Sequence, residues 1–92
     1  MKFTLSHSRA VTGNDISVQV EADDGDALTL VTSELDGFSL AEDDLSPPDS
    51  SYDRSFNQAG LASPAMDHVL NVSATASSGK TRAATHRWTD ET

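Results

Sequence analysis

The feature that most constrains how this chain folds is the alternation of apolar and polar residues in its last quarter, residues 68–88. Apolar side chains recur at every second position over residues 70–74, and alternation resumes over residues 82–88, after the sequence Ser-Ser-Gly-Lys at 77–80. A period of two is typical of strands that bury one face, and serine and glycine favour tight turns. These residues therefore predict a β-hairpin, which needs a second layer to be stable in water.

The upstream residues supply enough short strands for that second layer. The most regular of them places Ile16, Val18 and Val20 on one face, as a half-buried strand requires. Asp36-Gly37 is the strongest signal for a hairpin turn in the chain. The strands predicted before the last hairpin are residues 2–7, 16–22, 27–35 (with Leu28 and Leu30 inward), 38–40 and 52–56.

Two segments are predicted to lack strands. Residues 42–51 contain Pro47 and Pro48, and proline lacks the N–H that a central strand needs, so a loop is expected. Residues 57–67 are expected to form a long connection because glycine and proline punctuate them. The pattern of about seven short strands, with turns every 8–12 residues, favours a single antiparallel β-sandwich domain over residues 1–92.

Residues 61–74, with the sequence LASPAMDHVLNVSA, resemble the corner before the sixth strand, and that strand itself, in fibronectin type III and bacterial immunoglobulin-like modules. The Asp36-Gly37 turn and the hairpin at Gly79 resemble the bacterial modules as well. His68 stands where a corner tyrosine is usual, and Trp88 lies on the last strand rather than on an early one. The resemblance implies an immunoglobulin-like β-sandwich that acts as a non-catalytic structural or binding module.

The charge of the chain excludes several classes of partner. Its formal net charge is −9, with 15 Asp and Glu against 6 Lys and Arg. Repulsion between like charges should keep such a chain from nucleic acids and anionic membranes. No stretch reaches the length of a transmembrane helix, so no membrane insertion is expected. The absence of cysteine excludes disulfides and cysteine-ligated metals.

Acidic residues gather in two stretches, Asp23-Asp24-Gly25-Asp26 and residues 42–44. Calcium needs several oxygen ligands at about 2.3–2.6 Å, which makes Asp23, Asp24 and Asp26 candidate ligands. These residues lack the twelve-residue spacing of an EF-hand loop. A solvated acidic loop is therefore the preferred interpretation, and no metal site is predicted.

The three histidines, His7, His68 and His86, lie far apart in the sequence. His7 and His86 would approach each other if the first and last strands were neighbours, as they can be in such sandwiches. A metal site there would still need a third ligand and supporting partners. Surface or packing roles are therefore expected for all three.

Motifs that indicate catalysis are absent from the sequence. There is no Gly-x-Ser-x-Gly nucleophile elbow, no His-Glu-x-x-His metal motif and no glycine-rich phosphate loop. Carboxylates clustered in the loops of a small acidic domain usually serve solubility rather than acid–base chemistry. The chain is therefore not expected to be an enzyme, and no cofactor is predicted.

Basic and acidic residues occupy different parts of the chain. Residues 21–53 contain eleven acidic residues and no Lys or Arg, whereas Lys80, Arg82 and Arg87 lie in the last hairpin. Basic residues on an edge strand can simply discourage strand pairing between molecules. Alternatively, they dock against an acidic surface of another protein or of a second copy. Trp88 is the candidate apolar anchor of that contact, unless it packs in its own core.

Two biological settings fit a non-catalytic module of this kind. The first is a small structural protein of a virion, such as a capsid decoration or tail component, which suits a chain without an apolar signal segment after Met1. The alternative is an excised immunoglobulin-like accessory or adhesion module of a secreted, multidomain cell-surface or carbohydrate-acting protein. The virion is the preferred prediction at this point, with an extracellular or cell-surface location as the alternative.

Overall fold

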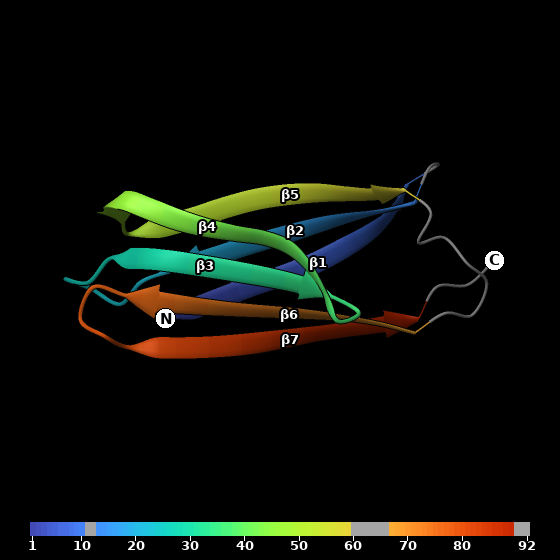
Figure 1. The fold of residues 1–92 in the computed structure, drawn as a ribbon. Coiled ribbons are helices and arrows are strands. Elements are labelled where there is room, and N and C mark those ends of the chain that lie inside the picture. Colours follow the sequence, from blue (N-terminus) through green and yellow to red (C-terminus); the bar gives the residue numbers. More distant parts are fainter. Residues whose placement is uncertain (11–12, 60–66, 90–92) are drawn as a thin grey trace.

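The computed structural model describes residues 1–10, 13–59 and 67–89, which form two antiparallel sheets packed face to face (Figure 1). The strands are β1 (Lys2–Ala10), β2 (Gly13–Glu21), β3 (Leu28–Leu35), β4 (Phe38–Asp49), β5 (Ser51–Ala59), β6 (Asp67–Ala76) and β7 (Thr81–Thr89). One sheet has the strand order β1-β2-β5 and the other β4-β3-β6-β7. The predicted all-β, immunoglobulin-like sandwich of about seven strands is confirmed, and so is the hairpin in the last quarter of the chain.

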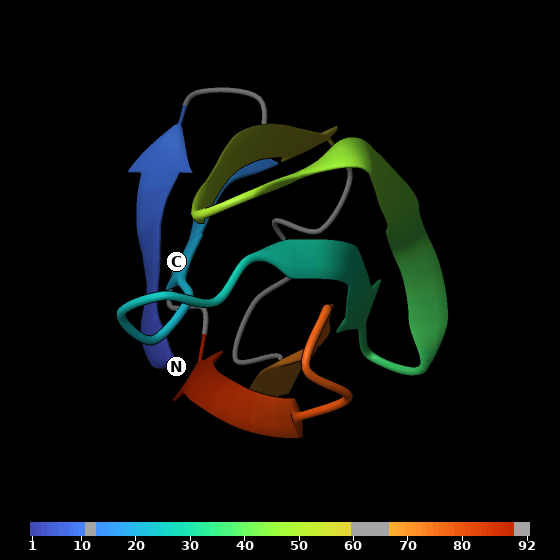
Figure 2. The same ribbon diagram turned by 90° about the vertical axis from the view of Figure 1, so that its left-hand side faces the viewer.

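The core lies between the two sheets and is built from alternate residues of the central strands. Ile16 and Val18 of β2 face Leu70 and Val72 of β6, and each of these four side chains is at most 1% exposed. Figure 2 looks along the strands and shows the two layers that enclose this core. Val, Leu and Ile fill it because their branched side chains pack well on a pleated surface.

One predicted inward position, Leu30, is wrong. β3 buries Leu28, Val31 and Leu35, whereas Leu30 is half-buried. The pairing of β3 with both neighbours shifts register between Leu28 and Leu30. Such a bulge reverses the side on which the following residues point, and a sequence pattern with a fixed period of two cannot anticipate it.

The predicted loop at residues 42–51 is also wrong, because β4 continues to Asp49 and β5 begins at Ser51. β4 is the edge strand of its sheet and needs ladder hydrogen bonds on one side only. Its register with β3 also shifts between Asp44 and Asp49, and this irregularity accommodates Pro47 and Pro48. β5 is likewise longer than the predicted 52–56, and the predicted connection at 57–67 falls mostly on 60–66, outside the described residues.

The Asp36-Gly37 turn joins β3 to β4, as predicted. Both residues have positive φ, 54° and 85°, as the favoured two-residue hairpin turn requires. Asp36 also binds the start of β6, because its backbone N donates to Val69 O at 2.9 Å and its Oδ1 accepts from Val69 N at 2.8 Å. The turn therefore fixes the position of β6 as well as that of β4.

Candidate functional site

Polar and aromatic side chains from different sheets meet at both long edges of the sandwich. At one edge β1 lies beside β7 (Figure 2). There His7 Nδ1 is 2.8 Å from His86 Nε2. The His7 ring stacks on Trp88, with ring centres 4.5 Å apart and planes 11° from parallel. We call His7, His86 and Trp88 the histidine seam. The approach of His7 to His86 is therefore confirmed.

The alternation of both strands explains why these rings meet. His7 has the same parity in β1 as Phe3 and Leu5, which pack against the core. His86 has the same parity in β7 as Trp88, which is 9% exposed. Side chains two residues apart in a strand share a face, so both histidines are directed toward the gap between the sheets. His7 remains exposed there and His86 is half-buried.

His68 supports the histidine seam from within the core. Its ring lies 5.3 Å from that of Trp88, and only 1% of the residue is exposed. Its Nδ1 makes a 2.7 Å hydrogen bond with Asp36 Oδ2. A buried polar ring needs such a partner, since leaving it without one would cost free energy. His68 stands at the corner position where the resemblance implies a tyrosine. Its side chain makes a hydrogen bond to the β3–β4 turn.

At the opposite edge, β4 and β5 are joined by Asp43, Tyr52 and Arg54, which we call the carboxylate seam. Tyr52 Oη donates to Asp43 Oδ2 at 2.5 Å, and Arg54 Nη1 donates to the two Asp43 oxygens at 2.8 and 2.7 Å. Burial, followed by the bond to Asp43, raises the pKa of Tyr52 to about 12. The hydrogen bonds from Tyr52 and Arg54 lower the pKa of Asp43. The sequence indicates an acidic stretch at residues 42–44 but not the contact of Asp43 with Tyr52 and Arg54, because Asp43 falls in the segment predicted to be a loop.

The three calcium candidates do not share one coordination centre. Asp23 forms ion pairs with Lys80 and with the Met1 amino group, and the hydrogen bond from Lys80 is the main cause that lowers the pKa of Asp23 to about 2. Asp26 accepts hydrogen bonds from Ser78 Oγ at 2.5 Å and Ala27 N at 2.9 Å. Asp24 is exposed. In residues 1–10, 13–59 and 67–89, no group of three or more His, Cys, Asp or Glu has an arrangement that could hold a metal.

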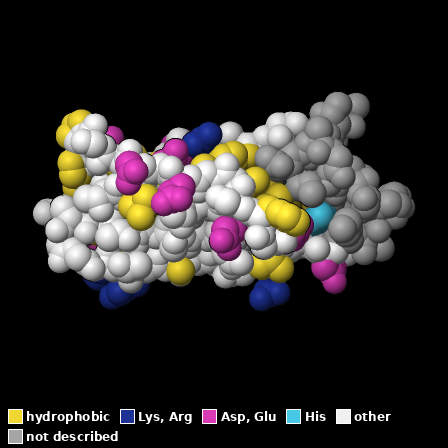
Figure 3. All heavy atoms as spheres, viewed as in Figure 1, with side chains coloured by type: hydrophobic (Ala, Val, Ile, Leu, Met, Phe, Trp, Pro, Cys, Tyr) yellow, Lys and Arg dark blue, Asp and Glu magenta, His cyan; other side chains and the backbone are white. Residues whose placement is uncertain are grey.

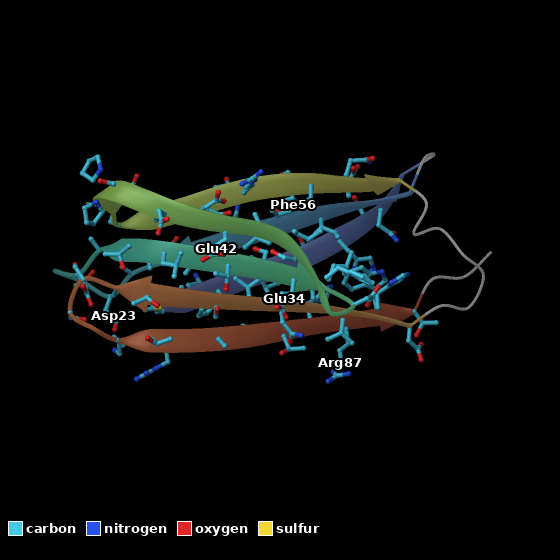
Figure 4. All side chains as sticks on the ribbon, in the orientation of Figure 1. Asp23, Glu34, Glu42, Phe56 and Arg87 are labelled. Carbon is cyan, nitrogen blue, oxygen red and sulfur yellow. The ribbon has the colours of Figure 1, made fainter. Side chains whose placement is uncertain are left out.

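The four predicted partner-binding residues lie in different surroundings. Lys80 is paired with Asp23, and Trp88 packs in the core, which was the alternative considered for it. Arg82 and Arg87 are exposed on β7, and Arg87 points away from both sheets (Figure 4). Separate acidic side chains lie over β3 and β4 on the face shown in Figure 3, whereas basic ones lie along the β7 edge and at one place on the opposite edge. The exposed basic surface on β7 therefore consists of Arg82 and Arg87, which belong to opposite faces of this edge strand.

The outer face of the four-stranded sheet carries an open depression between β3, β6 and β7. Small side chains line it, and Thr32 Oγ1 and Ser73 Oγ form a 2.5 Å hydrogen bond there. Glu34 is the one ionisable side chain among its lining residues, so acid–base chemistry with paired carboxylates has no basis in it. The described residues also contain no helix that is long and apolar enough to cross a membrane.

Comparison with solved structures identifies a similar fold. A structure of fibronectin(III)-like modules of Clostridium thermocellum CbhA has a TM-score of 0.51 and 12% sequence identity, covering 96% of this chain and 97% of that chain. No family model matches the sequence, and no curated protein does. An identity this low establishes the fold alone. The strand order and the comparison agree that the chain has the immunoglobulin-like β-sandwich fold of fibronectin(III)-like modules.

Proposed function

We propose that this chain is a non-catalytic accessory or adhesion module of a secreted, multidomain cell-surface or carbohydrate-acting protein. The observation that carries the proposal is the strand order, β1-β2-β5 in one sheet and β4-β3-β6-β7 in the other. The alignment with the structure of fibronectin(III)-like modules covers 97% of that chain. The protein with which it shares this fold is described as having modules, which are units of a longer polypeptide. Folds of this kind generally serve binding and spacing, not catalysis.

A small structural protein of a virion is the other setting that such a sandwich suits. Neither the fold comparison nor the described residues supply an observation in its favour. The likeness to the CbhA modules instead supports the reading as a module of a larger protein. We therefore prefer that reading to a capsid decoration or tail component.

The proposed partner is another protein, either a neighbouring module or a second copy of this chain. The proposed contact is the exposed basic surface on β7, Arg82 and Arg87, which would meet an acidic surface. Each exposed ion pair contributes at most about 1 kcal/mol, so these charges would orient a partner rather than hold it alone. Lys80 and Trp88 would support the surface from beneath, through the Asp23 ion pair and core packing.

Antibodies raised against the purified chain test the biological setting. Applied to fractions of the native source, they should detect a polypeptide longer than these 92 residues in the extracellular or cell-surface fraction. Pre-absorption of the antibodies with the purified chain is the control for specificity. Detection of a 92-residue polypeptide in purified virus particles would overturn the proposal and favour the virion.

A further inference from the structure

We propose that β7 of one copy of this chain pairs antiparallel with β4 of a second copy, so that the four-stranded sheet continues from one molecule into the next. These strands are the two edges of that sheet (Figure 1), and in the described residues neither has a strand partner on its outer side. β1 and β5 of the other sheet approach them through the side chains of the two seams. The unpaired backbone N–H and C=O groups of an edge strand can bind another strand.

The topology of the sheet permits this pairing between copies in the same orientation, apart from the twist of the sheet. Each neighbouring pair in the order β4-β3-β6-β7 is antiparallel, so β7 runs opposite to β4. A second copy placed beside β7 therefore presents its β4 antiparallel to β7. The contact joins different surfaces of the two molecules, which leaves one free β4 and one free β7 for further copies.

The register across the sheet brings unlike charges together in this arrangement. Arg82 of β7 and Asp43 of β4 lie at the same level, because both align with Val31 of β3, Arg82 through its pairing partner on β6. Asp43 already belongs to the carboxylate seam, so the exposed Glu42 and Asp44 on either side of it are the carboxylates left to attract arginine. Unlike charges that face each other across a strand pair are stabilising.

The positions of the two exposed arginines favour an edge contact over a face contact. Arg82 and Arg87 belong to opposite faces of β7, so a partner on one face reaches one of them, whereas a strand added along the edge lies beside both. Arg87 is next to His86, which lies level with Phe38 because both align with Leu35. Phe38 is 77% exposed, and a guanidinium group packs favourably on an aromatic ring. The contact would therefore cover this ring.

The charges of the two edges disfavour symmetric pairings. Two β4 edges would place carboxylates against carboxylates, and two β7 edges would place arginines against arginines. The net charge of −9 already opposes association between copies, so a contact must bring unlike charges together to form. Of the pairings between the edges of this sheet, β7 with β4 does so. The proposal rests on the proposed function for the contact at Arg82 and Arg87, and it gives that contact one partner.

Sedimentation velocity of the untagged chain at about 0.15 M NaCl tests the association. The wild type should form dimers and larger species as its concentration rises toward about 1 mM. Glu42→Lys should weaken this association at least about tenfold, because it places a second basic residue near Arg82. Glu34→Lys is the matched control, since it makes the same change of charge at an exposed residue of β3, an inner strand (Figure 4), and should associate like the wild type.

A mixture of two variants tests the direction of the contact. Arg82→Glu leaves β4 intact, and Glu42→Lys leaves β7 intact. Neither should associate alone at concentrations at which the wild type does, whereas an equimolar mixture should, because the intact β4 of one meets the intact β7 of the other. A mixture that stays monomeric would overturn the proposal. The comparison of Glu42→Lys with Glu34→Lys keeps the test decisive if Arg82→Glu does not fold.

Amide hydrogen exchange separates strand pairing from attraction between side chains. Exchange should slow at alternate amides of β7 and β4 as the concentration rises, because an edge strand directs every second N–H outward. Association without this slowing, a wild type that is monomeric at about 1 mM, or equal association by Glu42→Lys and Glu34→Lys would overturn the proposal. Each of these results leaves the proposed setting intact, since the antibodies against the native polypeptide test that separately.

Discussion

The two long edges of the sandwich are closed by different chemistry. The carboxylate seam joins strands that follow each other in the chain, with Tyr52 only 9 residues from Asp43. The histidine seam joins the first strand to the last, with His7 and His86 79 residues apart. Closing a longer loop costs more conformational entropy. The distant contact is accordingly backed by the large, buried Trp88, whereas the local one consists of hydrogen bonds to a partly exposed carboxylate.

The two edges are held by different kinds of interaction: aromatic packing at one and hydrogen bonds to a carboxylate at the other. In the histidine seam, Trp88 contributes mainly through buried area and dispersion, which depend little on pH. The carboxylate seam contributes through hydrogen bonds to the ionised carboxylate of Asp43, one of them from the neutral hydroxyl of Tyr52. Its strength therefore depends on the protonation state of both groups. The two edges should therefore respond to different perturbations, and the following predictions separate them from the largest expected effect to the smallest.

Removal of the Trp88 side chain should have the largest effect. Trp88→Ala leaves a cavity beside His7 and His68, and such truncations cost about 3–5 kcal/mol. Urea denaturation followed by circular dichroism would measure the loss of unfolding free energy. Phe38→Ala is the matched control, because Phe38 is 77% exposed and its truncation should change stability by less than about 0.5 kcal/mol. A loss below 1 kcal/mol for Trp88→Ala would show that the histidine seam does not depend on this ring.

Removal of the Asp43 carboxylate should have an intermediate effect. Asp43→Ala deprives Tyr52 and Arg54 of their acceptor, and hydrogen bonds to a charged group contribute about 1.5–3 kcal/mol. The control is Asp44→Ala, since Asp44 is exposed and should tolerate truncation within about 0.5 kcal/mol. Equal losses of unfolding free energy for the two variants would mean that Asp43 does not stabilise the contact between β4 and β5.

Part of the dependence of stability on pH should come from the carboxylate seam. The pKa of Tyr52 rises from 10.0 to about 12 on folding, so its contribution is complete below pH 10 and is lost as the pH rises toward 12. The pKa of Asp43 is lowered from 3.8, so its contribution is present above that value and is lost as the pH falls below it. Melting temperatures between pH 9 and 12 should fall less in Tyr52→Phe than in the wild type. Melting temperatures that fall equally in Tyr52→Phe and in the wild type would contradict the assignment of this pH dependence to Tyr52.

Reversal of the basic charges on β7 should have the smallest effect on folding. Arg82 and Arg87 are exposed, so the double variant Arg82→Glu with Arg87→Glu should unfold within about 1 kcal/mol of the wild type. Its affinity for the native protein partner should nevertheless fall, because like charges would then face each other. Co-purification of that partner at matched ionic strength measures the effect. Unchanged recovery by the folded variant would exclude this surface as the contact.

Most of the sandwich could be predicted from the sequence, because its central strands have one buried face. Ile16, Val18 and Val20 were predicted to face the interior, and each is at most 1% exposed. The error at Leu30 arose from a bulge, which changes the register without any change in local composition. The error at residues 42–51 arose from reading Pro47 and Pro48 as the end of a strand, although an edge strand tolerates proline.

The candidate sites were less predictable, because they depend on which strands become neighbours. The sequence predicts the approach of His7 to His86 only on the condition that the first and last strands are neighbours. Nothing in the sequence paired Asp43 with Tyr52, or Asp26 with Ser78. These contacts depend on the exact alignment of strands in different layers, which periodicity does not specify.

The sequence by itself determined the class of fold, the buried faces of β2 and β6 and the positions of the Asp36-Gly37 and Gly79 turns, because these depend on short-range alternation and backbone preferences. Only the tertiary structure decided that Trp88 is buried, that Lys80 is paired with Asp23 and that two histidines meet across the edge of the sheets. Each of these outcomes depends on the distance between residues far apart in the chain. That distance is set by how the two sheets pack, and packing depends on all the strands together.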